Sequence, residues 1–122
     1  MAQNLVELDL QRAKVKDTHL QKLGALKHLK RLNLGQCITW SDDKMGYLSP
    51  LFNLESLDLS GMKGITPAGL RHLAPLENLR ELLLLGCRVT GAGLQELAKL
   101  KGLKVLRLTT NNKHPFSAEH LS

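Results

Sequence analysis

A six-residue pattern, Leu-x-x-Leu-x-Leu, occurs five times in this chain at an almost constant interval. Its first leucines are Leu5, Leu29, Leu54, Leu79 and Leu103, so consecutive copies begin 24 or 25 residues apart. Five copies at so regular a period in a chain of 122 residues are not explained by chance. A fixed period of about 20–50 residues is typical of architectures in which each repeat covers the apolar face of its neighbour.

Each repeat has the pattern of a strand followed by a helix. Apolar and polar positions alternate in the first half, which is the period of a half-buried strand. The second half carries three apolar residues spaced by three, which keeps one helical stripe facing inward for about two turns. These triplets are Leu20/Leu23/Leu26, Met45/Leu48/Leu51, Leu70/Leu73/Leu76 and Leu94/Leu97/Leu100. We expect strands to begin near residues 6, 30, 55, 80 and 104, with helices near 17–25, 42–51, 67–75 and 91–100.

Helix-start residues precede these helices at matching places. Thr66-Pro67 predicts an N-cap followed by proline at the first helical position. Thr90-Gly91, Ser41-Asp42-Asp43 and Ser117 fall at the equivalent place, and the acidic pair after Ser41 suits a helix N-terminus.

Stacked units of this kind predict an α/β fold, a curved solenoid of about 4.5–5 repeats. Successive strands pair into one parallel sheet at a spacing of about 4.8 Å. Because helices are wider than strands, we expect the sheet on the concave face and the helices on the convex face. The chain is interpreted as a single domain over residues 1–122, with repeats at 4–27, 28–52, 53–77 and 78–102 and a truncated repeat at 103–122.

Two repeats resemble a known repeat family. Repeat three contains Gly64-Ile65-Thr66-Pro67-Ala68-Gly69-Leu70, and repeat four contains Cys87-Arg88-Val89-Thr90-Gly91-Ala92-Gly93-Leu94. Together with their leucines they resemble the motif LxxLxLxxCxxITxxGLxxLxxL of the cysteine-containing leucine-rich repeats, which occur in F-box substrate receptors of ubiquitin ligases and in many bacterial repeat proteins. The resemblance covers essentially the whole chain and implies the fold, but the same repeats serve many partners. The sequence departs from the motif at the cysteine position, which is Ala13, Met62 and Asn111 in repeats one, three and five, and it shows no F-box ahead of the repeats.

The two cysteines, Cys37 and Cys87, share one motif position two repeats apart. Two strand spacings are roughly 9.6 Å, beyond the roughly 7 Å limit between the Cα atoms of a disulfide. We expect buried, reduced thiols and an intracellular, cytoplasmic location. Two cysteines are too few for a zinc site without a histidine cluster, and the histidines show no ligand spacing, so we expect no metal and no cofactor.

Trp40, the single tryptophan, stands five residues before the first apolar residue of its helix. The same offset gives Val15, Ile65, Val89 and Phe116 in the other repeats. We therefore expect Trp40 in a core slot, with one edge exposed, and not as a binding anchor.

Catalysis, membrane insertion and nucleic-acid binding are not expected. The sequence contains no nucleophile elbow, P-loop, dinucleotide fingerprint or zinc-protease motif. It has no secretory signal and no run of roughly 18 consecutive apolar residues. The net charge of +6 permits an anionic partner. Basic residues near the helix-to-strand turns suggest a phosphate-binding edge, but stacking aromatics are missing. They are Lys27, Lys30, Arg31, Lys99, Lys101 and Lys104.

The concave face is the candidate binding surface, because positions three and five of the motif point away from the core. Position three is occupied by Glu7, Arg31, Ser56, Glu81 and Val105, and position five by Asp9, Asn33, Asp58, Leu83 and Arg107. Position seven, at the strand exit, is occupied by Gln11, Gly35, Ser60, Leu85 and Thr109. The residues predicted to contact a partner are Glu7, Asp9, Arg31, Asn33, Asp58, Glu81, Leu83, Leu85, Val105 and Arg107.

Leu83 and Leu85 are apolar at positions that carry mostly polar residues in the other repeats. Beside Val105, and rimmed by Glu81 and Arg107, they suggest the centre of an interface with another protein. The alternative is a patch covered by the chain's own segment 111–115. The predicted function is therefore a non-catalytic protein-binding module; a structural subunit of a larger assembly, or the recognition part of a ubiquitin-ligase receptor, stays open. The convex-face residues Arg71, His72, Gln95 and Glu96 are expected to be solvated.

Neither end of the repeat array shows a cap. The first motif begins at Leu5, and the helix expected to begin at Ser117 stops after one turn. Terminal repeats without caps leave one apolar side open. We therefore expect a fragment of a longer repeat protein, or end-to-end association with another chain.

Overall fold

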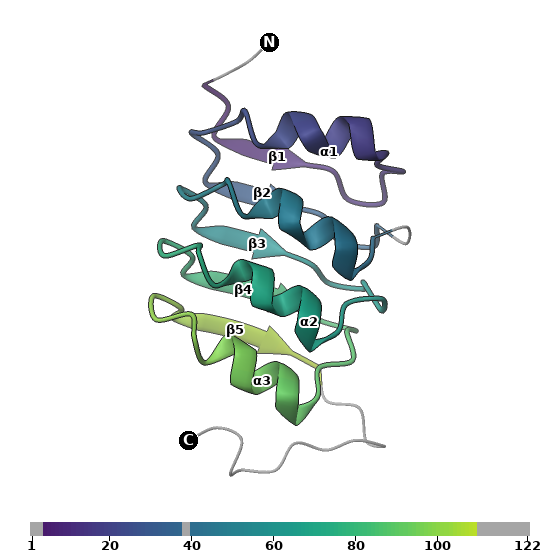
Figure 1. Cartoon of the computed structure of the whole chain (residues 1–122), viewed down its shortest axis with the longest axis vertical. Coiled ribbons are helices and arrows are strands. Elements are labelled where there is room, and N and C mark those ends of the chain that lie inside the picture. Colours follow the sequence, from purple (N-terminus) through teal and green to yellow (C-terminus); the bar gives the residue numbers. More distant parts are fainter. Residues whose placement is uncertain (1–3, 38–39, 110–122) are drawn as a thin grey trace.

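The computed structural model describes residues 4–37 and 40–109, and in this part five strands form one parallel sheet in chain order. The strands are β1 (Glu7–Asp9), β2 (Arg31–Asn33), β3 (Ser56–Asp58), β4 (Glu81–Leu84) and β5 (Val105–Leu108). Figure 1 shows the strands stacked in one layer and the helices in a second layer on one side of it. The predicted α/β solenoid with its parallel sheet is confirmed, and each strand begins within one residue of the expected place.

The helical segments also lie where the apolar triplets placed them, but two of them are wound more tightly. They are α1 (Asp17–Leu23), the 3₁₀ helix η1 (Asp42–Leu48), α2 (Pro67–Leu70) continued by the 3₁₀ turn η2 (Arg71–Leu73), and α3 (Gly91–Leu97). A 3₁₀ helix has three residues per turn, so side chains three apart lie directly above one another. The spacing of Met45, Leu48 and Leu51 matches that winding as well as it matches an α-helix.

The core is an aliphatic ladder between the two layers. The strands pair without any shift between repeats, so Leu32 stands opposite Leu57 and Leu57 opposite Leu82. All three side chains are buried. The neighbours on either side of each leucine, all polar except Leu83, face away from the helices, as strand alternation requires.

Trp40 lies inside this core, 3% exposed, and its indole N–H donates to the sulfur of Met45 at 3.1 Å. The expected core slot is confirmed, but the expected exposed edge is wrong, because the tryptophan lies beneath η1. In the same slot Val15 and Ile65 are buried and Val89 partly buried; Phe116 lies outside the described residues.

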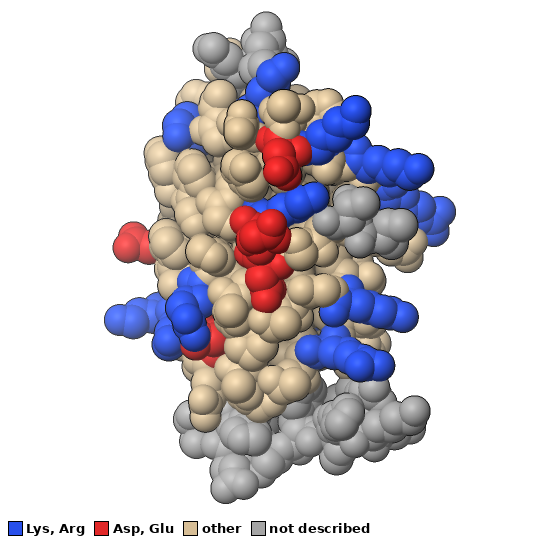
Figure 2. All heavy atoms as spheres, turned by 45° about the vertical axis from the view of Figure 1, so that its right-hand side comes forward, with Lys and Arg blue, Asp and Glu red and all other residues tan. Residues whose placement is uncertain are grey.

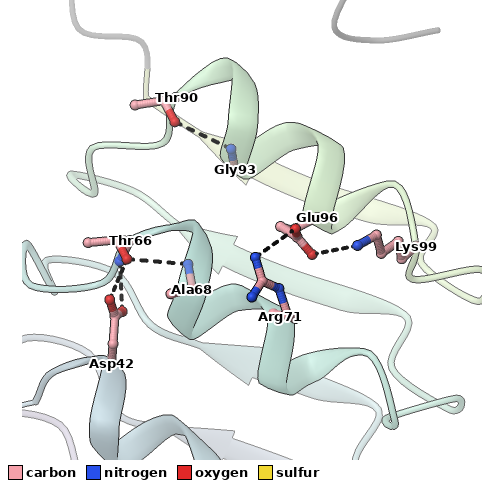
Figure 3. A network of polar contacts seen from close by, with 8 residues as sticks. All are labelled: Asp42, Thr66, Ala68, Arg71, Thr90, Gly93, Glu96 and Lys99. Carbon is pink, nitrogen blue, oxygen red and sulfur yellow. Dashed lines mark hydrogen bonds and ion pairs between the residues drawn. The ribbon is translucent and has the colours of Figure 1, made fainter.

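A carboxylate joins neighbouring repeats at the helix starts (Figure 3). Asp42, at the beginning of η1, accepts a hydrogen bond from the backbone N–H of Thr66 at 2.8 Å and another from the Thr66 hydroxyl. Thr66 in turn caps α2 by accepting from the N–H of Ala68 at 3.3 Å. Pro67 occupies the first turn as predicted.

The other predicted caps differ from one another. The Thr90 hydroxyl accepts from the N–H of Gly93 at 3.3 Å, which confirms it as the cap of α3. Ser41 stands at the N-cap of η1 but makes no side-chain cap, because its hydroxyl donates to the Asp43 carboxylate instead. The predicted start at Ser117 lies outside the described residues.

A second polar cluster connects the later helices on the outer layer (Figure 3). Glu96 of α3 lies 2.9 Å from the Lys99 ammonium and 3.5 Å from the Arg71 guanidinium of η2. The hydrogen bond from Lys99 holds the pKa of the Glu96 carboxyl below its ordinary value. Arg71, His72 and Gln95 are exposed as predicted, whereas the Glu96 side chain is only 12% exposed, because it bridges the two helices. Within the described residues, no helix is both long enough and apolar enough to span a membrane.

Candidate binding surface

The face of the sheet that the helices do not cover is named here the open sheet face, and it carries the predicted contact residues in straight rows. Position three forms one row, in which Glu7 pairs with Arg31, Arg31 with Ser56, Ser56 with Glu81 and Glu81 with Val105. Position five forms the next row, Asp9, Asn33, Asp58, Leu83 and Arg107. Glu7, Asp9, Arg31, Leu85, Val105 and Arg107 are exposed, while Asn33, Asp58, Glu81 and Leu83 are partly buried.

The polar side chains in the row at position three contact one another across the strands. The Arg31 guanidinium lies 3.2 Å from the Glu7 carboxylate. The Ser56 hydroxyl donates to the Glu81 carboxylate at 2.8 Å. Both contacts join neighbouring strands, so these residues form cross-strand pairs, which stabilise a sheet modestly.

The acidic and amide residues in the row at position five have a structural role that sequence analysis missed. Each side-chain oxygen accepts from the backbone N–H two residues later, where the chain leaves the strand. The pairs are Asp9 with Gln11 at 2.9 Å, Asn33 with Gly35 at 2.8 Å and Asp58 with Ser60 at 2.9 Å. Asp and Asn favour this local turn, so their recurrence at the strand ends was the available signal.

This pattern stops at the fourth repeat, where Leu83 replaces the turn-forming side chain. The N–H of Leu85 accordingly donates to the Ser60 hydroxyl of the preceding repeat, at 3.1 Å. Leu85 is 41% exposed, Val105 is 37% exposed and Leu83 is half-buried between Asp58 and Arg107. These three apolar side chains are called the leucine patch. Segment 111–115, the alternative cover for this patch, lies outside the described residues.

At the helix-to-strand edge, where the sequence suggests a phosphate site, three of the six basic residues are paired with acids. Lys30 lies 3.9 Å from Glu55, and Lys99 lies 2.9 Å from Glu96. Arg31 is paired with Glu7 on the open sheet face. Lys27 sits over the Phe52 ring at 5.8 Å. Glutamates therefore engage three of these residues and an aromatic ring a fourth.

Both cysteines lie beneath the strand-to-helix turns. The Cys37 thiol donates to the Leu10 carbonyl at 3.3 Å, and the Cys87 thiol to the Leu59 carbonyl at 3.1 Å. Both are buried and free, as predicted. Burial raises the pKa of each thiol above its ordinary value. Because the thiolate is the reactive species, both effects slow attack on a reagent.

We expect the native thiols to react with a disulfide reagent such as dithionitrobenzoate about 100-fold more slowly than the same chain in denaturant, because reaction requires local opening. A cysteine introduced at the exposed Ala98 serves as the fast-reacting control. Stopped-flow absorbance measures all three rates. Native-state labelling of Cys37 and Cys87 as fast as that of Ala98→Cys would show that they are accessible.

Within the described residues, no group of three or more His, Cys, Asp or Glu side chains is placed to hold a metal ion. Apart from Arg107, the polar residues at positions three and five of the open sheet face contact one another or the backbone. The open sheet face therefore presents rows of mostly polar side chains, interrupted by the leucine patch.

Comparison with known structures identifies the fold. The chain is similar to the C-terminal domain of tropomodulin from Caenorhabditis elegans, with a TM-score of 0.69 and 17% identity, covering 98% of this chain and 79% of that one. It is also similar to an internalin from Listeria monocytogenes, with a TM-score of 0.66 and 23% identity, covering 88% of this chain and 28% of the internalin. No protein-family model matches the sequence. No curated protein matches it either. At these identities the similarity shows the leucine-rich-repeat fold alone.

Proposed function

We propose that this chain is a non-catalytic protein-binding module that holds a partner protein against its open sheet face, centred on the leucine patch. The observation that carries the proposal is the break at Leu83. A turn-forming Asp or Asn occupies this position in repeats one to three, and its replacement exposes apolar surface in an otherwise polar row. Apolar surface at the centre of a polar face is the usual anatomy of a protein interface.

The surroundings of the patch support a protein partner. Glu81 and Arg107 stand beside it in register and supply one charge of each sign at the rim. Leucine-rich-repeat and other solenoids use extended sheet or groove surfaces for binding. The rows at positions three and five are held by cross-strand pairs and local turns, so the surface is already ordered before a partner arrives. A preordered surface lowers the entropic cost of association.

We expect the double substitution Leu83→Asp/Leu85→Asp to weaken partner binding tenfold or more, because truncating or charging residues at an interface centre typically costs about 2 kcal/mol or more. Affinity capture from an extract, quantified by mass spectrometry for wild type and variant, identifies the proteins that depend on the patch. Binding of the identified partner is then measured by titration.

The matched control is Ala92→Asp/Gln95→Asp, which places the same two carboxylates on exposed positions of α3. This control should retain the partner. Thermal unfolding must show that both variants are folded. Equal capture by wild type and the Leu83→Asp/Leu85→Asp variant would contradict the proposal.

A permanent structural subunit is the second candidate, and it predicts a different behaviour in isolation. A recognition module should be a soluble monomer by native mass measurement, whereas an obligate subunit should aggregate or be found only with its assembly. The same extract experiment separates the two, because a permanent assembly would survive washing at high salt with fixed stoichiometry.

A further inference from the structure

The turns that lead from the strands to the helices carry positive charge and no negative charge. Their described residues are 12–15, 36–37, 61–64 and 86–89, and none is Asp or Glu. They contain the exposed cations Arg12, Lys14, Lys63 and Arg88, which are named here the basic ledge. Figure 2 brings this side of the molecule forward and shows basic side chains along its right-hand border.

The backbone holds these turns in register. The strand ladder continues past the strands, with Arg12 N–H donating to the Gly35 carbonyl at 2.9 Å and Gly61 N–H to the Leu85 carbonyl at 2.7 Å. Equivalent turn positions therefore stack like the strands, which lie about 4.8 Å apart. Lys63 and Arg88 occupy the same position in adjacent turns, so two like charges are neighbours on a rigid support.

Neighbouring like charges destabilise a sheet unless something neutralises them. Among the described residues, none of the four cations forms an ion pair, whereas Arg31, Arg71 and Lys99 each pair with a glutamate. Arg12 donates from Nε to the neutral Gln36 side chain at 2.9 Å. The charge of the basic ledge is thus left for an anion from outside the described part of the chain.

A hollow lies on this edge, lined by Gln36, Gly61, Lys63 and Gly64. A glycine is required at position 61 of this hollow. Its backbone is in the left-handed region, at φ +79°, and a Cβ there would meet the Gln36 Cγ at 2.8 Å. The hollow gives an anionic side chain room to approach Lys63 from the solvent.

We infer that the basic ledge binds an acidic segment of the same partner protein whose apolar residues contact the leucine patch. This inference rests on the proposed function. It is supported by the adjacency of the leucine patch and the basic ledge along one turn. Leu85 is followed immediately by Gly86, Cys87 and Arg88 in one turn. A polypeptide that leaves Leu85 in the direction of this turn reaches Arg88 and then Lys63.

A polypeptide fits this surface better than a nucleic acid. Single-stranded nucleic acids are held by aromatic stacking combined with positive charge. Within the described residues, Trp40 is buried, Tyr47 is partly buried against the core, and the exposed Phe52 lies at the opposite, helix-to-strand edge. The side chain that precedes Arg88's turn is Leu85, which matches an apolar residue of a peptide.

The test selects peptides from a displayed library of random 12-residue sequences with four proteins: wild type, Lys63→Glu/Arg88→Glu, Lys101→Glu/Lys104→Glu and Leu83→Asp/Leu85→Asp. The two charge-reversal variants change net charge equally, and Lys101 and Lys104 are exposed at the helix-to-strand edge. Wild type should enrich peptides with several Asp or Glu residues and apolar residues. Lys63→Glu/Arg88→Glu should lose the acidic enrichment and bind the best synthetic peptide about tenfold more weakly, whereas Lys101→Glu/Lys104→Glu should stay within twofold of wild type.

Each contrary result has a definite meaning. Absence of acidic enrichment with wild type, or equal loss in both charge-reversal variants, overturns the basic ledge. So does tighter binding of a single-stranded RNA, or of vesicles containing phosphatidylserine, than of the best peptide. The variant Leu83→Asp/Leu85→Asp should keep acidic enrichment and lose the apolar preference. If this variant instead selects the same peptides as wild type, the proposed function is contradicted, whereas binding of acidic peptides by the basic ledge is not.

Discussion

Replacing Leu57 with alanine is expected to lower the free energy of unfolding by about 3–5 kcal/mol, at the upper end of the range for buried leucines. The Leu57 side chain is fully buried in the central strand β3. It stands between Leu32 and Leu82, which the strand register holds in place. Neighbours fixed in this way cannot collapse into the space left behind, and the cost of such a substitution grows with the residual cavity.

The position of Leu57 in the array adds to this effect. A solenoid is stabilised by contacts between adjacent repeats, and the third repeat contributes to the contacts on both of its sides. Equilibrium urea unfolding, followed by far-ultraviolet circular dichroism, measures the change. The matched control is Leu85→Ala, the same deletion at a side chain that is 41% exposed, where we expect a cost below about 1 kcal/mol. Equal costs at the two positions would contradict the assigned core.

The sequence was sufficient to predict the strands, because two periods coincide. Alternation within the motif sets which face of each strand is buried, and the repeat interval sets the register between strands. Leu8, Leu32, Leu57, Leu82 and Leu106 therefore had to align. No long-range contact needed to be guessed, since each repeat contacts its neighbour through the same residues.

The helical layer was harder to predict, because its spacing is ambiguous. Apolar residues three apart fit an α-helix for two turns and a 3₁₀ helix equally well. Glu96 and Trp40 were misjudged for a related reason. Their exposure depends on what packs against them, which is Arg71 of the preceding repeat for Glu96 and the helix η1 of its own repeat for Trp40.

On the candidate surface, the sequence predicted which side chains share the open sheet face but not what each one does there. The oxygens of Asp9, Asn33 and Asp58 are engaged by backbone N–H groups at the strand exits. Their polarity therefore has a structural cause that is independent of any partner. Leu83 has no such local role, which is why the leucine patch carries the proposal more strongly than the acidic residues.

Gly69→Ala is expected to destabilise the native chain by about 2–3 kcal/mol, although alanine normally favours a helix by about 1 kcal/mol over glycine. A Cβ on Gly69 would clash with the Asp42 carboxylate oxygen and would lie 3.2 Å from Met45 Cγ. The carboxylate would have to leave Thr66, whose N–H and hydroxyl it accepts. Hydrogen bonds to a charged group contribute about 1.5–3 kcal/mol, and crowding at Met45 adds to the loss.

A double-mutant cycle with Asp42→Ala tests this cause directly. Asp42→Ala alone should also destabilise, because it removes the bridge from η1 to the start of α2 (Figure 3). With the carboxylate gone, the added methyl group no longer meets an oxygen, and the helix preference for alanine remains. Gly69→Ala should then be close to neutral or mildly stabilising in the Asp42→Ala background, a coupling of about 2 kcal/mol measured by urea unfolding of all four proteins. Strict additivity would show that Gly69 is required for a reason other than its approach to Asp42.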